Sequence, residues 1–233
     1  MTNLAAATFL DEEHTLLRNH LRRFVSDKLK PHVDEWENAK TFPRRLYRDV
    51  AEAGFLGIGF PEEYGGSGGD LLHMLISAEE LTRSGSPGLA ASLGSLVIAL
   101  PPILKAGTEE QKQRWLPRVL SGEWIASLAV TEPGTGSDVA AISTTAVRDG
   151  DDFVLNGSKT FITSGARADF VTAIVRTGDE GAAGISVIGV ETDRPGFKVW
   201  NTLEKMGWHP SDTAELVFED LRVPADNLIG PLD

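Results

Sequence analysis

The sequence predicts an α+β multidomain protein, with an all-α bundle over residues 1–124 followed by an antiparallel β-barrel or sandwich over residues 125–233. Before residue 125, apolar residues recur at the helical spacing of three and four. After it, the spacing shifts towards two, β-branched residues increase, and Gly, Asp and Pro separate short apolar runs. Because no helical segment alternates with these runs, a doubly wound nucleotide-binding fold is not expected.

The first two helices follow from an apolar stripe and two prolines. The stripe covers residues 17–29 and predicts a helix that Pro31 should end or bend. Pro43 stands where a second helix can begin. Leu46 and Val50, four residues apart, would then share one face of that helix.

A glycine-rich stretch divides these helices from the rest of the helical part. Residues 57–69 hold too many glycines for a helix and predict a long surface loop. Asp70 is a suitable N-cap for the helix that follows. Residues 89–106 are apolar on nearly all sides, which predicts a buried helix interrupted where two prolines stand together. Thr108 and Gln111 fit a capping box that starts the last helix.

Short apolar runs and turn residues predict the strands of the second part. Residues 144–155 read as a hairpin with a glycine in its Asp-Gly-Asp-Asp turn. Further strands are expected at 170–175, 185–190 and 216–218. A strand should also lead into a loop that contains two glycines, near residue 130.

The amino-acid composition argues against several classes of function. Among 233 residues, 22 Lys and Arg stand against 34 Asp and Glu, so the net charge is 22 − 34 = −12. That acidity disfavours nucleic acid as a partner, because nucleic-acid binding needs a basic surface. With no cysteine, the chain has no disulfides, no zinc-thiolate site and no cysteine nucleophile. The five histidines show no metal-ligand spacing such as H-E-x-x-H, so no metal site is expected.

The sequence also bears on compartment. It has no run of 18 apolar residues, so no membrane span is expected. Its first residues lack the basic start and apolar core of a signal peptide. Cytoplasmic localisation is therefore the expectation.

Residues 129–138 are the sharpest candidate for chemistry. This loop combines two glycines with three hydroxyl side chains. Glycines let a ligand approach the backbone closely, and Thr and Ser add short hydroxyl donors, which suits a flavin edge or a pyrophosphate. The loop lacks the Gly-Lys-Ser/Thr ending of a Walker loop and the third glycine of a dinucleotide fingerprint. A tight inter-strand loop without a ligand is the other interpretation.

Residues 156–165 form the second candidate. Phe161 and Thr163 lie two apart, so they would share one side of a strand. That pair can cover a planar ring and bond one of its heteroatoms. Taken alone, a single core Phe at a strand end explains the same pattern.

These two segments, TEPGTGSD at 131–138 and FITSG at 161–165, resemble the flavin-binding signatures of acyl-CoA dehydrogenases in sequence, order and spacing. Other segments resemble the same family: FPEEYGGSG at 60–68, GTEEQK at 107–112 and VFEDLRVP at 217–224. The resemblance covers the whole chain. It is specific to the family and not to one substrate.

The resemblance implies FAD as cofactor, acyl-CoA as substrate, and α,β-dehydrogenation of the thioester in fatty-acid catabolism. It implies that the following residues line the flavin and its pyrophosphate: Leu128, Val130, Thr131, Gly136, Ser137, Phe161, Ile162 and Thr163. Ser137 would also lie near the acyl-CoA, Phe161 would stack by the flavin, and Thr163 would donate towards its N5. An electron-transfer flavoprotein would receive the electrons, and the full-length form would be a homo-oligomer, either a tetramer or a dimer.

The chain departs from the family in two respects. The family usually has Trp at the position of Phe161 and Asn at that of Ser164; Phe keeps a ring face and loses the indole N–H. In addition, the family's C-terminal four-helix bundle, which carries the catalytic glutamate, is missing after Asp233. No catalytic residue is therefore expected in this chain, Glu132 is expected to serve structure, and the chain alone is expected to be inactive.

Two further functions remain open from the sequence. A flavin monooxygenase or oxidase of the same superfamily would keep the fold and change the chemistry. A non-catalytic truncated paralogue, acting as a binding or pairing subunit, would account for the missing base.

Overall fold

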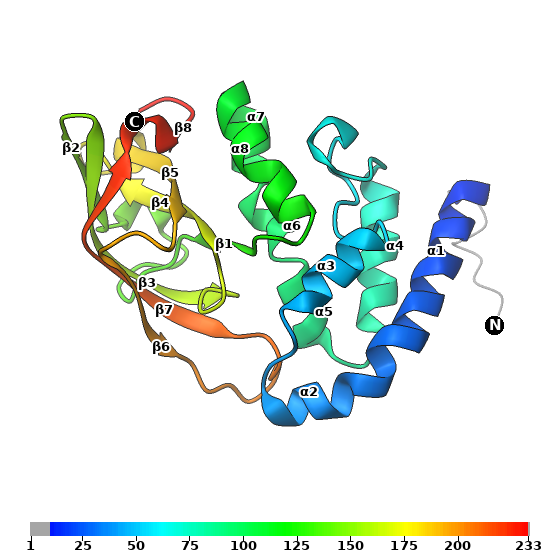
Figure 1. Ribbon diagram of the computed structural model, residues 1–233. Coiled ribbons are helices and arrows are strands. Elements are labelled where there is room, and N and C mark those ends of the chain that lie inside the picture. Colours follow the sequence, from blue (N-terminus) through cyan, green and yellow to red (C-terminus); the bar gives the residue numbers. More distant parts are fainter. Residues whose placement is uncertain (1–9, 233) are drawn as a thin grey trace.

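A computed structural model describes residues 10–232 and places helices before strands, as predicted (Figure 1). The helices are α1 (Glu12–Phe24), α2 (Val33–Ala39), α3 (Arg45–Glu52), α4 (Leu71–Thr82), α5 (Pro87–Leu93), α6 (Leu96–Ala99), α7 (Pro101–Ala106) and α8 (Glu109–Leu120). The strands are β1 (Ala126–Ala129), β2 (Thr145–Asp149), β3 (Asp152–Thr163), β4 (Phe170–Arg176), β5 (Ile185–Glu191), β6 (Phe197–Thr202), β7 (Thr213–Pro224) and β8 (Leu228–Ile229).

Helix boundaries follow the caps that the sequence contains. The Asp70 side chain accepts hydrogen bonds from the first turn of α4, and Thr108 with Gln111 closes a capping box on α8. Before Pro31, the chain after α1 widens into a π-turn at Val25–Leu29 and then tightens into a 3₁₀ turn at Lys30–His32. The proline therefore bends the chain into α2, as expected.

The apolar stretch over residues 87–106 is broken into α5, α6 and α7, with the last break at Pro101. Within residues 10–232, this stretch alone is long and apolar enough to cross a membrane, judged by length and composition. Half of that window is buried inside the protein, and Leu89, Leu93 and Ile103 are at most 2% exposed. Such burial is typical of a core helix.

All eight strands join in one sheet, in the order β6-β7-β3-β2-β4-β5-β8, with β1 paired to β4. The predicted hairpin is confirmed as β2 and β3, which turn at Gly150 with φ +63°. The purely antiparallel arrangement was wrong in one respect, because β1 runs parallel to β4 and β2 meets β4 in parallel at Thr145 and Arg176. The physical reason is that β1 enters the sheet from the helical part and not through a hairpin.

The sequence reading missed β6 and β8. Strand β6 is exposed along nearly its whole length, so it carries no apolar alternation to reveal it. Strand β8 has only two residues. The short run at 216–218 lies inside the much longer β7.

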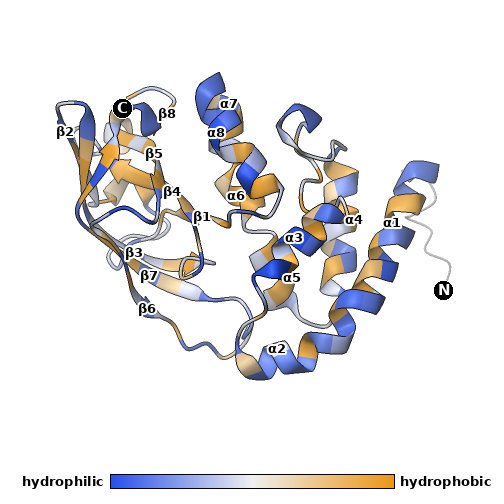
Figure 2. Ribbon diagram, in the orientation of Figure 1, coloured by the Kyte–Doolittle hydropathy of each residue, from blue (hydrophilic) through white to orange (hydrophobic). Residues whose placement is uncertain are grey.

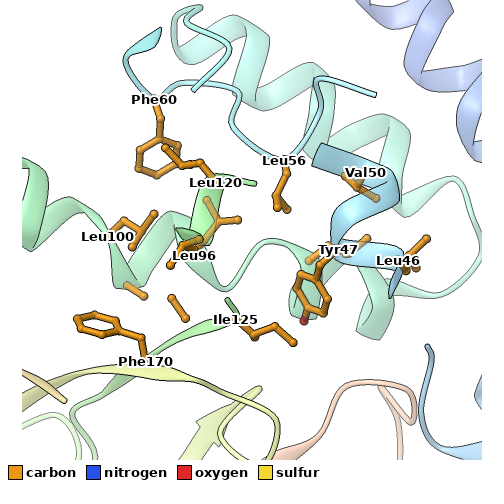
Figure 3. Packing of buried hydrophobic residues seen from close by; sticks show 14 of the residues in the cluster. Leu46, Tyr47, Val50, Leu56, Phe60, Leu96, Leu100, Leu120, Ile125 and Phe170 are labelled. Atoms are coloured by element: carbon orange, nitrogen blue, oxygen red, sulfur yellow. The ribbon is translucent and has the colours of Figure 1, made fainter. Parts of the chain in front are cut away.

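One apolar core joins the helical part to the sheet (Figure 3). It extends from Tyr47 and Leu96 on the helices to Ile125 and Phe170 on the sheet side. Strand β4 is buried on both faces, and Figure 2 shows it largely apolar, whereas α1 alternates between polar and apolar residues. The second core cluster lies within the β-domain and fills the other face of the sheet.

Candidate functional site

Strand β1 leads into the first candidate loop, which begins with a tight turn. The Glu132 N–H donates to the Thr135 carbonyl at 2.9 Å, and the Thr135 N–H donates back to the Glu132 carbonyl at 3.1 Å. Beyond the turn, Gly136 and Ser137 are exposed. A methyl group placed on Gly134 or Gly136 would meet no atom of the described chain within 4 Å. The loop therefore presents open backbone to its surroundings.

A buried ion pair anchors this loop from below. Glu132 is 4% exposed, and its carboxylate accepts hydrogen bonds from the Lys159 ammonium at 2.8 Å and from Ser143 and Thr144. Lys159 is fully buried and also donates to the Val130 carbonyl at 3.0 Å. Glu132 thus serves structure, as the sequence reading expected.

The groups around Glu132 keep its carboxylate ionised. Burial raises the pKa of its carboxyl, but the hydrogen bonds from Lys159, Thr144 and Ser143 outweigh burial and lower that pKa from 4.5 to about 2. Burial lowers the pKa of Lys159, and Glu132 opposes that effect. A carboxylate that binds its protons so weakly is a poor general base.

The two candidate segments meet in space, although about thirty residues separate them. The Thr160 N–H donates to the Thr131 carbonyl at 2.8 Å, beside the bond from Lys159 to Val130. These two bonds stand where the regular hydrogen bonds between β3 and β7 are interrupted, because β3 shifts register against β7 between Lys159 and Ile162. The predicted residues 128–137 and 161–163 therefore border one surface at the end of β1 and β3.

Phe161 lies on this surface in an unusual conformation. Its φ is +60°, in the left-handed region that bulky residues rarely adopt, and it is 66% exposed. Strain of this kind collects at functional sites. Its neighbours differ: Ile162 is 2% exposed and packs in the β-domain core, so only its backbone borders the surface, while Thr163 is half-buried.

The remaining predicted residues are half-buried or exposed. Leu128 is half-buried against the core that joins the two parts, and Val130 and Thr131 are also half-buried. Ser137 is exposed on the loop. The structure thus joins the two segments at Val130–Thr131 and Lys159–Thr160, and Leu128 and Ile162 are turned towards protein cores.

Three buried serines tie this region to the helical part. The Ser164 hydroxyl donates to Ser92 Oγ at 3.2 Å, and the Ser92 hydroxyl donates to Ser211 Oγ at 3.0 Å. All three are at most 1% exposed. The Tyr47 hydroxyl also donates to the Ser92 carbonyl, at 3.1 Å. Helix α5, which carries Ser92, is thereby fixed against the end of β3.

Helices α4, α5 and α6 border an apolar pocket of about 670 Å³. Its lining includes Leu71, Met74 and Leu75 of α4, and Ser77 and Thr82 contribute hydroxyl groups. None of its lining residues carries a titratable side chain. Its size and apolar character suit a hydrophobic ligand.

Trp208, from the loop between β6 and β7, reaches the edge of this pocket. It has φ +57° and is 52% exposed. Its backbone passes so close to α5 that a Cβ on Gly88 would lie 2.7 Å from the Trp208 Cα. The β-domain therefore completes a pocket that is otherwise built from the helical part, including the turn segment at 55–58.

The sequence reading missed the pocket and the serine chain. One signal for the pocket was available, since α4 carries Leu71 and Leu75 in addition to the inward-facing Ile76. Those two leucines are 77% and 61% exposed. No pattern in the sequence could join Ser92, Ser164 and Ser211, because they come from three distant segments.

Comparisons with known proteins agree with this geometry. The family model described as "Acyl-CoA dehydrogenase, N-terminal domain" matches residues 11–123, and "Acyl-CoA dehydrogenase, middle domain" matches residues 127–221. The mitochondrial long-chain specific acyl-CoA dehydrogenase of Mus musculus is 40% identical over 233 residues, which cover 99% of this chain and 54% of that protein. The chain thus spans about half the length of this curated relative.

Solved structures give the same result. A probable acyl-CoA dehydrogenase from Mycobacterium abscessus is 49% identical with a TM-score of 0.93, covering 95% of this chain and 59% of that one. A glutaryl-CoA dehydrogenase from Mycobacterium smegmatis, solved in complex with FADH2, is 36% identical with a TM-score of 0.87. That match covers 96% of this chain and 56% of the other.

Proposed function

Because this chain belongs to the acyl-CoA dehydrogenase family, we propose that it supplies the flavin-binding surface and part of the acyl pocket of an FAD-dependent dehydrogenase. The reaction would introduce a double bond between the α and β carbons of an acyl-CoA thioester. One observation carries the proposal: the bonds from Thr160 and Lys159 unite the two candidate segments, and the Ser164–Ser92 bond ties them to α5, which lines the apolar pocket with other residues.

The residues present suit a flavin. The open backbone at Gly134 and Gly136 would receive the polar edge or pyrophosphate of FAD, with the exposed Ser137 as a hydroxyl donor. Phe161 offers an exposed ring face, and Thr163 lies two residues along the same strand end. When bound, FAD would supply the acceptor for the hydride that leaves the β-carbon.

This chain's own residues would position the substrate and exclude water. The apolar walls from α4 and α5 would bind the acyl chain, and Trp208 would close one edge of the pocket. Ser137, exposed on the loop, would contact the acyl-CoA. Removing water around the thioester strengthens the electrostatic interactions that act on it.

Removal of the α-proton needs a base, and neither the pocket lining nor Glu132 offers one. The pocket lining holds no titratable group, and Glu132 is buried in its ion pair with Lys159. We therefore propose that the base comes from outside residues 1–233 and that these residues alone are inactive. An electron-transfer flavoprotein as electron acceptor and a homo-oligomeric full-length form complete the proposal.

A titration of residues 1–233 with FAD, followed by flavin fluorescence, tests the cofactor surface. Phe161→Ala should weaken binding by about 2- to 10-fold, because an aromatic pair contributes about 0.5–1.5 kcal/mol. Val147→Ala is the matched control, since Val147 is another apolar strand residue, 63% exposed, outside the two segments. Equal effects of the two substitutions, or no FAD binding by the unaltered chain, would contradict the proposed surface.

A second measurement addresses the reaction. In the natural assembly that contains this chain, anaerobic addition of acyl-CoA should bleach the flavin absorption band. Residues 1–233 alone should show no turnover with a thioester panel and an artificial electron acceptor; turnover would reveal a base within the chain. Rapid oxygen consumption with substrate bound would identify an oxidase or monooxygenase instead. A colourless natural assembly would favour the non-catalytic pairing subunit.

A further inference from the structure

The Thr163 hydroxyl is available to a ligand, whereas the main chain of the same residue is not. Thr163 is half-buried at the end of β3, and among residues 10–232 its side chain takes part in no hydrogen bond. Its carbonyl accepts a hydrogen bond at 2.9 Å from the hydroxyl of Ser127, a fully buried residue of β1. A side chain from another strand therefore holds the backbone that carries a free hydroxyl.

The backbone around Thr163 is strained. Phe161, two residues before it, has φ +60°, and Ser164, the next residue, has φ +59°. Left-handed backbone is unfavourable for residues that carry a Cβ, so two such residues within four positions persist only where the surrounding structure holds them. Contacts from outside the segment must therefore fix its conformation.

Hydrogen bonds hold both peptide groups that flank the Thr163 Cα. The group between Thr163 and Ser164 is held at both ends: its carbonyl accepts from the Ser127 hydroxyl. Its N–H donates to the Asp212 carbonyl at 2.9 Å. In the preceding peptide group, the carbonyl accepts from the Gly165 N–H at 3.1 Å. Because a peptide group is planar, these bonds fix the orientation of each plane.

The same bonds set the direction of the Thr163 hydroxyl. The orientations of the two peptide groups determine φ and ψ of Thr163, and these determine where its Cα–Cβ bond points. Threonine is branched at Cβ, so few χ1 rotamers are open to it on a fixed backbone. A shift of the peptide group after Thr163 would therefore move the hydroxyl.

Of the three bonds just described, only the one from Ser127 comes from a side chain; the other two join main-chain groups. Strand β1 pairs with β4 in the sheet, and the Ser127 hydroxyl links it to β3, which pairs with β2 and β7. The bond from Lys159 to Val130 makes a second such link near the start of the loop. Ser127 and Lys159 together hold β1 and the loop after it against the end of β3.

We propose that Ser127 is a positioning residue of the flavin surface: its buried hydroxyl fixes the peptide group after Thr163 and so directs the Thr163 hydroxyl towards the bound cofactor. This inference rests on the proposed function, which sets Thr163 beside the flavin. Ser127 itself would not touch the cofactor, because it is fully buried and its hydroxyl is bonded to the Thr163 carbonyl. Its effect on the flavin would pass through Thr163.

A purely structural role is the competing explanation of the Ser127 bond. A buried carbonyl needs a donor, and a serine hydroxyl can supply one without any effect on a ligand. Ser95 does so nearby: it is 3% exposed, and its hydroxyl donates at 2.9 Å to the Ala126 carbonyl, outside both candidate segments. Ser95 is therefore the matched control for Ser127, with the same side chain, similar burial and the same bond length.

The sequence reading did not single out Ser127. A small residue between apolar neighbours is ordinary in a core strand, so nothing in the local pattern marks its hydroxyl. Thr163 lies 36 residues further along the chain. Only the packing of β1 beside the end of β3 shows which carbonyl the hydroxyl reaches.

A double-mutant cycle on FAD binding separates the two explanations. The 233-residue chain is titrated with FAD and followed by flavin fluorescence. Ser127→Ala and Thr163→Val should each weaken binding by about 2- to 10-fold, the equivalent of one hydrogen bond. Because Ser127 acts through Thr163, adding Ser127→Ala to Thr163→Val should weaken binding by less than about 2-fold further. Ser95→Ala should change the FAD affinity by less than about 2-fold.

The absorption spectrum of the bound flavin gives a second readout, which a merely structural role would not change. Ser127→Ala should shift the visible flavin bands in the same direction as Thr163→Val, and Ser95→Ala should leave them in place. Ser127→Cys keeps nearly the same side-chain volume and replaces the hydroxyl by a weak donor. It should therefore show the same effects to a smaller extent, and it serves as the test if Ser127→Ala does not fold.

Three results would overturn the inference: an unchanged FAD affinity in Ser127→Ala, additive losses in the double variant, or an equal loss in Ser95→Ala. If Phe161→Ala still weakens FAD binding in that case, the proposed function stands and only the role of Ser127 is wrong. An unaltered chain that binds no FAD would overturn both.

Discussion

The buried ion pair beneath the two candidate segments gives the sharpest stability prediction. Replacing Lys159 by Met keeps an unbranched side chain of similar length and removes the ammonium. Glu132, only 4% exposed, would then keep its bonds from Ser143 and Thr144 and lose the one from Lys159. The substitution leaves a buried carboxylate without its counter-charge.

The structure sets the magnitude. Removing one partner of a buried pair costs about 3–5 kcal/mol, because the other charge stays buried and uncompensated. A carboxyl whose pKa falls from 4.5 to about 2 on folding gains about 3 kcal/mol at neutral pH, a similar figure. Burial lowers the pKa of Lys159, which offsets part of that gain. We expect a loss of about 3 kcal/mol in the free energy of unfolding.

The assay is urea unfolding at neutral pH, followed by far-UV circular dichroism. Lys198→Met is the matched control: Lys198 pairs with Glu219 on the same sheet, and both side chains are more than half exposed. Because exposed pairs contribute little, that control should cost less than about 1 kcal/mol. A double variant with Glu132→Gln should lose less than the sum of the single losses.

Two outcomes would refute this reasoning. A Lys159→Met chain within about 0.5 kcal/mol of the control would show that the ammonium does not compensate the carboxylate. Strict additivity in the double variant would show that the two side chains do not interact.

Two further predictions concern acid stability and the contact between the parts. The pKa of Glu132 is lower in the folded chain than its ordinary 4.5, so its contribution is present above that pH and is lost as pH falls from about 4.5 towards about 2. Unfolding free energies measured across this window should fall more steeply for the unaltered chain than for Glu132→Gln; parallel profiles would contradict the assignment. Gly88→Ala should cost about 1–3 kcal/mol, because its Cβ would lie 2.7 Å from the Trp208 Cα. Thermal melts of both variants check this prediction. Gly134→Ala, whose Cβ would meet no neighbour within 4 Å, should change the free energy of unfolding by less than about 0.5 kcal/mol. Equal losses in the two variants would show that α5 and the Trp208 loop can move apart without cost.

Local signals in the sequence predicted much of the fold. Asp70 and Thr108 cap their helices as expected, since a cap depends only on neighbours three residues away. The hairpin at Gly150 also follows from local backbone preference. The parallel placement of β1 could not be read in this way, because strand direction depends on where the helical part delivers the chain.

The candidate site divides along the same line. Its two candidate segments were recognisable because their glycines and hydroxyls stand together in the sequence. The bulge that turns Phe161 outward, with φ +60°, was not, because it arises from the register of β3 against β7. The pocket was also hidden, since its lining comes from α3 to α6, the turn segment at 55–58 and the Trp208 loop.

By itself, the sequence determined most of the helices, several of the strands, which loop carries the glycines and hydroxyls, and which family the chain resembles. The tertiary structure alone decided that Lys159 neutralises Glu132, that Ser164 reaches Ser92, and that Ser127 reaches Thr163. The reason is the separation along the chain over which each interaction acts. Caps, turns and apolar periodicity act over a few residues, whereas ion pairs and pockets form between residues that only the packed core brings into contact.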